Sequence, residues 1–172
     1  AQAMLDHLIA YLRATLGGAR SALHPLQDEF ARLADYLEIM AVRMGPRLAF
    51  ALDLPDALRA VPVPPLLLQP LVENAIRHGL EPQVAGGHID LRASTRTGPG
   101  GSLLVLEVVD SGVGLGATPA HDTDRPGSHF GLAQVRERLA TLYGAQGTLE
   151  LIAGNTRGAC ARVTFPLNSS AP

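Results

Sequence analysis

The sequence predicts an α+β sandwich, in which helices pack on one face of a sheet. Two observations lead to this class. After two helical patterns, the chain runs in the order strand, helix, strand, strand, long loop, helix, strand, strand. The turns at residues 98–101 (GPGG) and 154–155 (GN) are short enough to join neighbouring strands as hairpins. Strands paired as hairpins, with helices on one face, give an α+β sandwich.

The N-terminal part of the chain is predicted to be helical. Residues 1–16 and 25–44 each place apolar side chains at helical spacing, and each run ends at glycine. The two helices form either a hairpin that serves for dimerisation or a pair that packs on the main domain, and the pattern leaves both open. The chain is thus expected to divide into a helical segment at 1–44, a domain at 45–167 and a loose tail at 168–172.

The main domain begins with a strand predicted at residues 47–54, where apolar and polar residues alternate, and a helix follows at 66–79. The further expected elements, in chain order, are strands at 88–97 and 102–110, a loop at 111–130, a helix at 132–143, and strands at 148–153 and 159–167. A loop of that length without periodicity, inside a compact domain, usually forms a functional lid.

The basic residues exclude several kinds of enzyme. All fourteen are arginines, and the chain has no lysine. A Walker A phosphate loop, a eukaryotic-type protein kinase and a pyridoxal enzyme each depend on a lysine, so none of the three fits. The net charge of −2 gives no broad basic surface for nucleic acid.

The single cysteine and the lack of a long apolar run favour a cytoplasmic setting. Cys160 alone cannot form an internal disulfide or a multi-thiolate metal site within one chain. No apolar run reaches the roughly 20 residues of a membrane-spanning helix, and the N-terminus lacks a signal-peptide pattern. Because the sequence starts directly in a helical pattern, we expect it to be part of a longer protein.

Residues 66–79 (LLLQPLVENAIRHG) form an amphipathic pattern with an unusual polar side. Asn74, Arg77 and His78 fall at i, i+3 and i+4 and share one face. An amide, a guanidinium and an imidazole together suggest a binding site, although a solvated helix face has the same pattern. The apolar residues recur at steps of three and four on the buried face and are Leu68, Leu71, Val72, Ala75 and Ile76.

A carboxylate directly follows the most apolar strand, in the sequence Asp110-Ser111-Gly112-Val113-Gly114. At such a strand end, Asp110 can accept a hydrogen bond from an exocyclic amine. Gly112 and Gly114 let the backbone approach a planar ring closely. Asp-Ser-Gly is also ordinary turn chemistry, so this motif alone does not decide between a site and a turn.

A second glycine-rich element, residues 127–132, leads into the last predicted helix. Gly131 directly before a helix leaves free N–H groups and the positive end of the helix dipole facing the loop, which favours an anion. The alternative is that Gly131 is merely a helix cap.

In this fixed order, the three elements resemble the ATP-binding catalytic domain of sensor histidine kinases, in the superfamily that includes gyrase, Hsp90 and MutL. The motifs LLQPLVENAIxHG, DxGxG and GLxxVxxRLxxLYG of the LytS/YehU-type branch match residues 67–79, 110–114 and 131–144. The resemblance covers about residues 24–167. It implies a Bergerat-type two-layer α/β sandwich with a mixed, mostly antiparallel sheet, and it implies ATP and Mg²⁺ as ligands.

The resemblance also implies roles for individual residues. Asn74 would supply an amide oxygen to Mg²⁺, Asp110 would accept the adenine amino group, and residues 115–130 would form the ATP lid. The implied ATP contacts are Asn74, Arg77, His78, Asp110, Gly112, Gly114, His129, Gly131 and Leu132.

Three arginines near the lid and its helix, Arg125, Arg136 and Arg138, could replace lysine in contacts with phosphate. Of these, Arg138 is expected to form structural salt bridges instead.

Two positions depart from the family pattern. Where the related hydrolases carry a glutamate base four residues before the asparagine, this chain has Pro70. Glu73 lies next to Asn74, about 100° around a helix, and is not an equivalent base. Slow hydrolysis is therefore expected. His129 replaces the usual glycine two positions before Gly131, which would stiffen the hinge of the lid or bring His129 to the nucleotide.

The resemblance thus implies that the chain is the ATP-binding kinase domain of a two-component sensor histidine kinase, anchored in the full-length protein at a bacterial inner membrane. It would pass the γ-phosphoryl group of ATP to a histidine outside this chain, for onward transfer to the receiver domain of a response regulator. His7 and His24 lack the Pro-His-Phe context of the LytS-type acceptor, so we expect an upstream acceptor helix in a homodimer. Two alternatives stay open: a degenerate, non-catalytic nucleotide-binding or interaction module, and a gyrase- or MutL-like ATPase.

Overall fold

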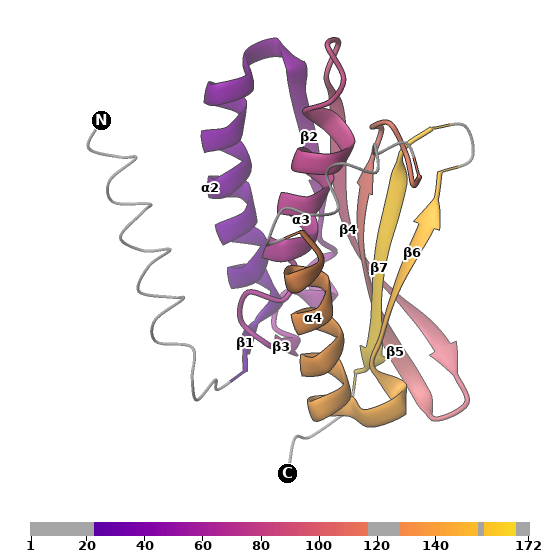
Figure 1. Ribbon diagram of the computed structural model, residues 1–172. Coiled ribbons are helices and arrows are strands. Elements are labelled where there is room, and N and C mark those ends of the chain that lie inside the picture. Colours follow the sequence, from indigo (N-terminus) through magenta and orange to yellow (C-terminus); the bar gives the residue numbers. More distant parts are fainter. Residues whose placement is uncertain (1–22, 117–127, 155–156, 168–172) are drawn as a thin grey trace.

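The computed structural model describes residues 23–116, 128–154 and 157–167 (Figure 1). The helical elements are α2 (Leu26–Met44), α3 (Gln69–Asn74), the π-helical segment η4 (Ala75–Leu80), α4 (Ser128–Tyr143), and the 3₁₀ turns η2 (Gly45–Arg47), η3 (Asp56–Leu58) and η6 (Gly144–Gln146). The strands are β1 (His24–Pro25), β2 (Leu48–Asp53), β3 (Pro62–Val63), β4 (Gly87–Gly98), β5 (Gly101–Asp110), β6 (Thr148–Ala153) and β7 (Ala159–Pro166). Within these ranges, no helix is long and apolar enough to cross a bilayer.

The main sheet is mixed and has the strand order β2-β4-β5-β7-β6. β2 and β4 are parallel, whereas β4–β5, β5–β7 and β6–β7 are antiparallel. A parallel pair needs a crossover, and the connection from β2 to β4 carries α3 and η4. α4 connects β5 to the edge strand β6, and β7 then returns to lie between them.

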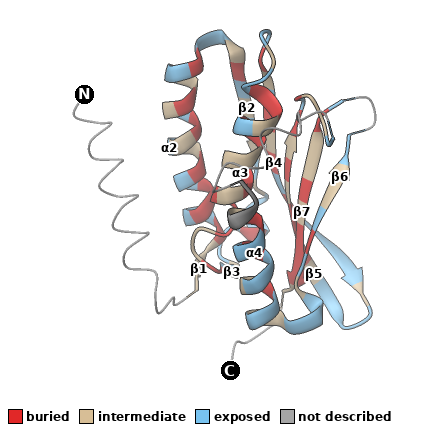
Figure 2. Ribbon diagram, viewed as in Figure 1, coloured by how far each residue is buried: buried red, intermediate tan, exposed pale blue. Residues whose placement is uncertain are grey.

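The helices α2, α3 with η4, and α4 lie on the same face of the sheet and turn their buried sides toward it (Figures 1 and 2). Alternation along β4 and β5 buries Ile89, Leu91, Leu104 and Leu106 completely. The same core contains apolar residues of the helices, namely Leu26, Phe30, Leu33, Leu37, Leu71, Val72, Ile76, Leu132, Val135 and Leu139. The predicted sandwich, with a mostly antiparallel sheet and helices on one face, is confirmed.

α2 packs in the core that it shares with the sheet. The other helix expected at the N-terminus, at residues 1–16, lies outside the described residues, as does the tail from residue 168. The remaining predicted elements agree with the structure within one residue at each end, apart from the two helices discussed next.

The helix predicted at residues 66–79 begins later than expected, at Gln69. Leu66 has a left-handed backbone with φ of 57°, which a right-handed helix cannot include. Pro70 falls in the first turn, where its missing N–H is not needed. Pro70 therefore marks the start of the regular helix.

The last helix begins earlier than predicted, at Ser128 rather than at residue 132. Gly131 consequently lies inside the first turn of α4, not before it, and the expectation of a glycine preceding the helix was wrong. The apolar repeat starts only at Leu132, and a first helical turn needs no apolar residue, so the periodicity placed the boundary too late. Residues 117–127, the middle of the expected lid, lie outside the described residues.

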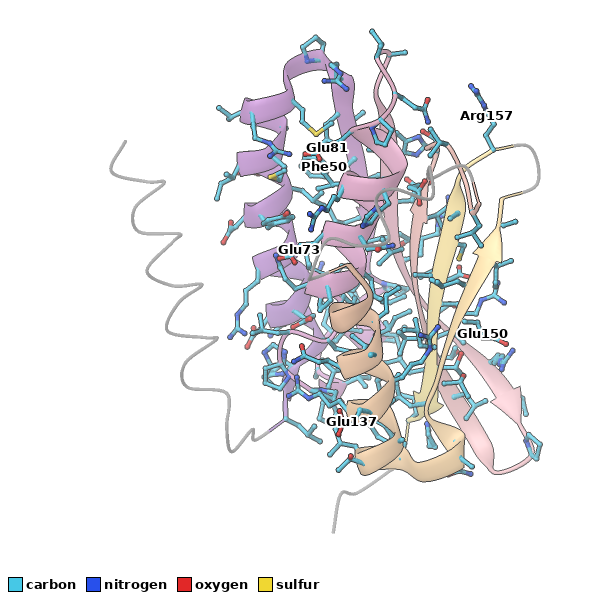
Figure 3. The ribbon with its side chains drawn as sticks, in the orientation of Figure 1. Phe50, Glu73, Glu81, Glu137, Glu150 and Arg157 are labelled. Carbon is cyan, nitrogen blue, oxygen red and sulfur yellow. The ribbon has the colours of Figure 1, made fainter. Side chains whose placement is uncertain are left out.

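The face of the sheet opposite the helices carries a row of alternating charges. The strand register places five charged residues side by side, one from each strand, in the order Asp53, Arg92, Glu107, Arg162 and Glu150. Arg162 Nε donates to Glu107 Oε1 at 2.8 Å, and Glu150 ends the row on β6 (Figure 3). Opposite charges on neighbouring strands contribute about 0.2–1 kcal/mol per pair. The uncovered face is thus suited to water.

A two-stranded ribbon, which the sequence did not predict, joins the start of α2 to the segment before α3. β1 and β3 pair antiparallel, with His24 opposite Val63. The N–H of Leu26 donates to the carbonyl of Val61 at 2.8 Å and so satisfies a group at the helix start that has no partner within the helix. Two-residue strands that contain proline show no alternating pattern, so the sequence holds no signal for them.

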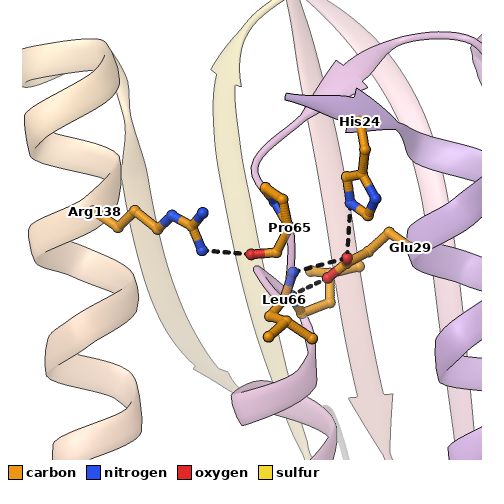
Figure 4. Close-up of polar contacts among 6 residues, drawn as sticks. His24, Glu29, Pro65, Leu66 and Arg138 are labelled. Carbon is orange, nitrogen blue, oxygen red and sulfur yellow. Dashed lines mark hydrogen bonds and ion pairs between the residues drawn. The ribbon is translucent and has the colours of Figure 1, made fainter. Parts of the chain in front are cut away.

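Glu29 of α2 holds the segment from which α3 starts (Figure 4). Its carboxylate is almost fully buried, with 1% of the residue exposed. Oε2 accepts the backbone N–H of Leu66 at 3.0 Å, and Oε1 accepts that of Leu68 at 2.9 Å. The acceptor for these two N–H groups therefore comes from a different helix.

Two further side chains act on the same segment. His24 Nε2 of β1 lies 3.1 Å from the Glu29 carboxylate. From the other side, Arg138 of α4 donates to the carbonyl of Pro65 (Figure 4). We call Glu29, His24 and Arg138 the polar clamp, because together they fix the backbone just ahead of α3.

We predict that Glu29→Gln lowers the free energy of unfolding by about 1–3 kcal/mol, because a buried backbone N–H then loses its charged acceptor. Glu38→Gln on the same helix is the matched control. Glu38 is exposed, so its change should stay within about 0.5 kcal/mol. Urea unfolding followed by circular dichroism measures both, and equal stability of the two variants would contradict the role of the clamp.

Candidate nucleotide-binding site

The polar pattern at residues 66–79 is carried by α3 and η4 in succession, which together we call the polar helix. α3 ends at Asn74, and η4 continues with wider turns, in which the N–H of Glu81 donates to the carbonyl of Ile76, five residues back, at 2.9 Å. π-helical turns are rare, and those that occur are often found at functional sites. The residues assigned to the buried face are all buried, as predicted: Leu68, Leu71, Val72, Ala75 and Ile76.

The three polar residues of the predicted site follow one another along this helix. Asn74 and His78 are half-buried, and Arg77 is exposed. The neighbouring Glu73 has a partner within α3, because Gln69 Nε2 donates to its Oε1 at 3.0 Å.

Asp110 is a buried carboxylate at the end of the central strand β5, with 7% of the residue exposed. The N–H of Gly112 donates to its Oδ1 at 2.8 Å, which closes the turn after the strand. Burial raises the pKa of Asp110 above its ordinary value, and hydrogen bonds from the backbone at Gly112 and Ala159 oppose that rise.

The end of η4 packs directly against this turn. A Cβ added to Gly79 would lie 2.7 Å from Oδ1 of Asp110, and a Cβ added to Gly112 would lie 2.3 Å from the carbonyl group of Gly79. The N–H of Val113 donates to the carbonyl of Gly79 at 3.1 Å. The structure therefore brings together two of the three predicted elements, the end of the polar helix and the DxGxG turn.

Gly158 is a residue at this turn that sequence reasoning missed. Its φ is 78°, and an added Cβ would lie 1.9 Å from the carbonyl oxygen of Asp110. Gly114, with φ of 86°, approaches Gly158 in turn, since an added Cβ would lie 3.2 Å from its carbonyl oxygen. Both positions require glycine. The signal in the sequence was only an isolated glycine in a turn far along the chain.

The third predicted element contacts the start of the polar helix. An added Cβ on Gly131 would lie 3.2 Å from Cβ of Pro70, and Leu132 is buried. Pro70, the departure from the hydrolase pattern, thus lies where α3 meets α4. The side chains of His129 and Arg125 lie outside those that the structure describes.

The two described arginines of α4 differ in their surroundings. Arg136 is exposed. Arg138 was expected to form structural salt bridges, whereas the structure gives it a hydrogen bond to the Pro65 carbonyl. Burial lowers the pKa of the Arg138 guanidinium, and the negative charge of Glu29 partly opposes that shift.

A metal at this site would depend on the nucleotide. The part of the chain that the structure describes has no cluster of three or more His, Cys, Asp or Glu side chains able to hold a metal ion. Mg²⁺ at such sites keeps several waters and binds through substrate phosphates and one or two carboxylates. Asn74 offers an amide oxygen in place of a carboxylate, so phosphates and water would supply the remaining ligands.

Fold and site together define a class of protein: a two-layer α+β domain with a buried carboxylate between glycines at the end of a central strand. Residues 65–169 match the family described as histidine kinase-, DNA gyrase B-, and HSP90-like ATPase, and residues 1–48 match the histidine kinase family. The chain belongs to the histidine kinase-, DNA gyrase B-, and HSP90-like ATPase family. The resemblance read from its motifs is confirmed, and the family description supports ATP as the nucleotide.

Two relatives of this chain are sensor proteins by name. Sensor protein LytS of Oceanobacillus iheyensis is 31% identical over 174 residues, which cover 96% of this chain and 29% of that protein. Sensor histidine kinase YesM of Bacillus subtilis is 30% identical over 141 residues, which cover 82% of this chain and 23% of that protein. The chain therefore spans less than a third of either relative.

Solved structures share the fold. The histidine kinase domain of the Erythrobacter litoralis EL346 blue-light activated histidine kinase superposes with a TM-score of 0.60 at 20% identity, covering 96% of this chain and 74% of that one. At this identity the likeness concerns the arrangement of helices and strands alone.

The burial of Asp110 leads to a prediction about pH. Because its pKa is raised above 3.8 in the folded protein, the folded state binds this proton more tightly than the unfolded state does. The contribution of Asp110 to stability is therefore present below pH 3.8 and is lost as the pH rises through the folded pKa. Asp110→Asn does not titrate, so it should gain stability relative to the unmodified protein as the pH rises through this window.

Urea unfolding of both proteins at steps between about pH 3.5 and 7 measures the difference. A difference in stability that is independent of pH would contradict the raised pKa.

Proposed function

We propose that this chain is the ATP-binding kinase domain of a two-component sensor histidine kinase. The observation that carries this assignment is Asp110, a buried carboxylate between Gly79 and Gly112, inside a stretch that matches an ATPase family. The names of the similar proteins, sensor protein and sensor histidine kinase, support the kinase rather than a gyrase-like function.

Adenine would bind at the end of β5. Asp110 would accept a hydrogen bond from the exocyclic amine, and a carboxylate has about four acceptor positions, so the bond from Gly112 can persist. Gly112 and Gly114 would line the ring, because neither places a side chain over it.

The phosphates would lie between the polar helix and the start of α4. Asn74 would ligate Mg²⁺, which supplies charge neutralisation to the phosphates when bound. Arg77 and His78 would face the phosphates from the same helix. The first turn of α4, which contains His129 and Gly131, has N–H groups without partners within the helix, and such groups favour an anion.

Transfer would break the bond between the γ-phosphorus and the β,γ-bridging oxygen, form a bond from phosphorus to an imidazole nitrogen, and release ADP. Positioning and charge stabilisation carry such a step. Pro70 stands where the related hydrolases have a base, and Glu73 is hydrogen-bonded to Gln69. Both observations support transfer to a partner over hydrolysis.

The acceptor histidine would come from outside the described residues. His24 is a poor candidate, because it lies on β1 next to the Glu29 carboxylate and its side chain is only 12% exposed. We place the acceptor on an upstream helix of a full-length homodimer anchored at the inner membrane. The receiver domain of a response regulator would take the phosphoryl group next.

We predict that the chain binds Mg²⁺·ATP saturably and that Asp110→Asn weakens binding by about tenfold to a hundredfold, since the acceptor loses its charge. Isothermal titration calorimetry measures both affinities. Asp53→Asn, on the exposed side of the edge strand β2, is the matched control and should bind as the unmodified chain does. A chain that does not bind, or an Asp110→Asn variant with unchanged affinity, would overturn the nucleotide site.

The type of reaction is tested in the full-length protein with ATP labelled at the γ-phosphate. Label on a histidine of the protein supports the kinase. Release of labelled phosphate with no labelled protein supports a hydrolase and contradicts the proposed function. Saturable ATP binding with neither outcome supports the non-catalytic alternative.

We predict that Asn74→Asp weakens Mg²⁺-dependent binding of ATP by about tenfold, because the carboxylate adds a negative charge that repels the phosphates. Titrations of ATP with and without Mg²⁺ measure this. Glu73→Gln is the control, since its partner is Gln69 of the same helix. The ligand role is refuted if Asn74→Asp keeps the magnesium dependence of the unmodified chain.

A further inference from the structure

Gly79 touches the carboxylate that the adenine ring would meet. We infer that Gly79 is a positioning residue for adenine recognition: its lack of a side chain lets Asp110 take the position from which it accepts the amine. This inference rests on the proposed function and concerns a residue to which neither the motif reading nor the comparisons assign a role.

The contact involves the whole carboxyl group. A Cβ on Gly79 would lie 2.7 Å from Oδ1, 2.9 Å from Cγ and 3.4 Å from Oδ2 of Asp110, and these are its three nearest atoms. Separations under 3.0 Å are essentially never found for real Cβ atoms. A methyl group at residue 79 must therefore move either the helix or the carboxylate.

The backbone at Gly79 is held in place by the turn itself. Its carbonyl accepts the N–H of Val113 at 3.1 Å, and a Cβ on Gly112 would already overlap the Gly79 backbone at 2.3 Å. η4 is also tied at its end by the bond from Glu81 to Ile76. The carboxylate, a side chain, is freer to move than this backbone.

Displacement of the carboxylate would disturb the hydrogen bonds that Asp110 accepts. Oδ1 accepts the N–H of Gly112 at 2.8 Å, so a shift that relieves the overlap with residue 79 stretches this bond and changes the direction in which Asp110 presents its lone pairs. Hydrogen bonds weaken steeply with misalignment. A purine with an amine at the 6-position would therefore bind more weakly. A purine without that amine makes no hydrogen bond to Asp110, so its affinity would not depend on this direction.

The test compares Gly79→Ala with the unmodified chain, using ATP and purine riboside 5′-triphosphate, which lacks the 6-amino group. We expect ATP affinity to fall about tenfold or more and the affinity for the analogue to change little, so that the preference for ATP collapses. Gly100→Ala, in the β4–β5 turn, is the matched control. There an added Cβ meets only the end of the Gln146 side chain, at 3.1 Å.

Two results would overturn the inference. Unchanged ATP affinity in Gly79→Ala would show that the methyl group is accommodated without effect. Equal losses for ATP and for the analogue would show a general structural role that does not act through the amine.

A second measurement covers the case in which Gly79→Ala does not fold. Asp110→Ala removes the three atoms that the added Cβ would meet, so Gly79→Ala/Asp110→Ala should recover cooperative urea unfolding. If the double variant is no more stable than Gly79→Ala, the inference falls. This cycle of stabilities needs no nucleotide. If the unmodified chain does not bind ATP, the proposed function is contradicted. The steric coupling between Gly79 and Asp110 is still measured by the stabilities of the variants.

Discussion

The two hydrogen bonds from the backbone of Leu66 and Leu68 to the carboxylate of Glu29 determine where the polar helix begins. N–H groups at the start of a helix have no partner within it, and each one left buried and unsatisfied costs about 1–3 kcal/mol. The chain arrives at this point through a left-handed residue, Leu66, rather than a regular turn. α2 thus supplies the acceptor that local structure does not, and Arg138 secures the opposite side of the same segment through the Pro65 carbonyl.

The polar helix is fixed at both of its ends, and the candidate site depends on both. At its start, Pro70 meets Gly131 of α4. At its end, Gly79 packs against Asp110, and the Gly79 carbonyl accepts the N–H of Val113. Asn74 lies between these two contacts. The buried charge of Asp110 opposes folding at neutral pH, as is expected of a residue that serves function rather than stability.

The features that could be predicted from the sequence are those that depend on local residue patterns. The alternation at residues 88–97 and the GPGG turn specify a hairpin, and Asp110 at the end of an apolar strand could be named as a candidate site residue. Contacts between distant segments have no such pattern. The helical period places Glu29 on the buried side of α2, yet nothing in it reveals that the partner is the backbone ahead of another helix. In the sequence, Gly79 is only the last residue of a motif, and its contact with Asp110 is visible only in the folded structure.

The order of the strands in the sheet indicates when the polar helix reaches its final position during folding. β4 with β5, and β6 with β7, join neighbours in sequence. β2 reaches β4 only after the crossover through α3 and η4 has closed, and β5 meets β7 only after the segment that carries α4 and β6. Non-local pairings of this kind form slowly, because the entropy of loop closure is lost before the contacts are gained. The candidate site is then complete only when these non-local pairings are complete. A ligand that binds the assembled form alone stabilises it by mass action, so ATP bound at the candidate site would also stabilise the folded domain.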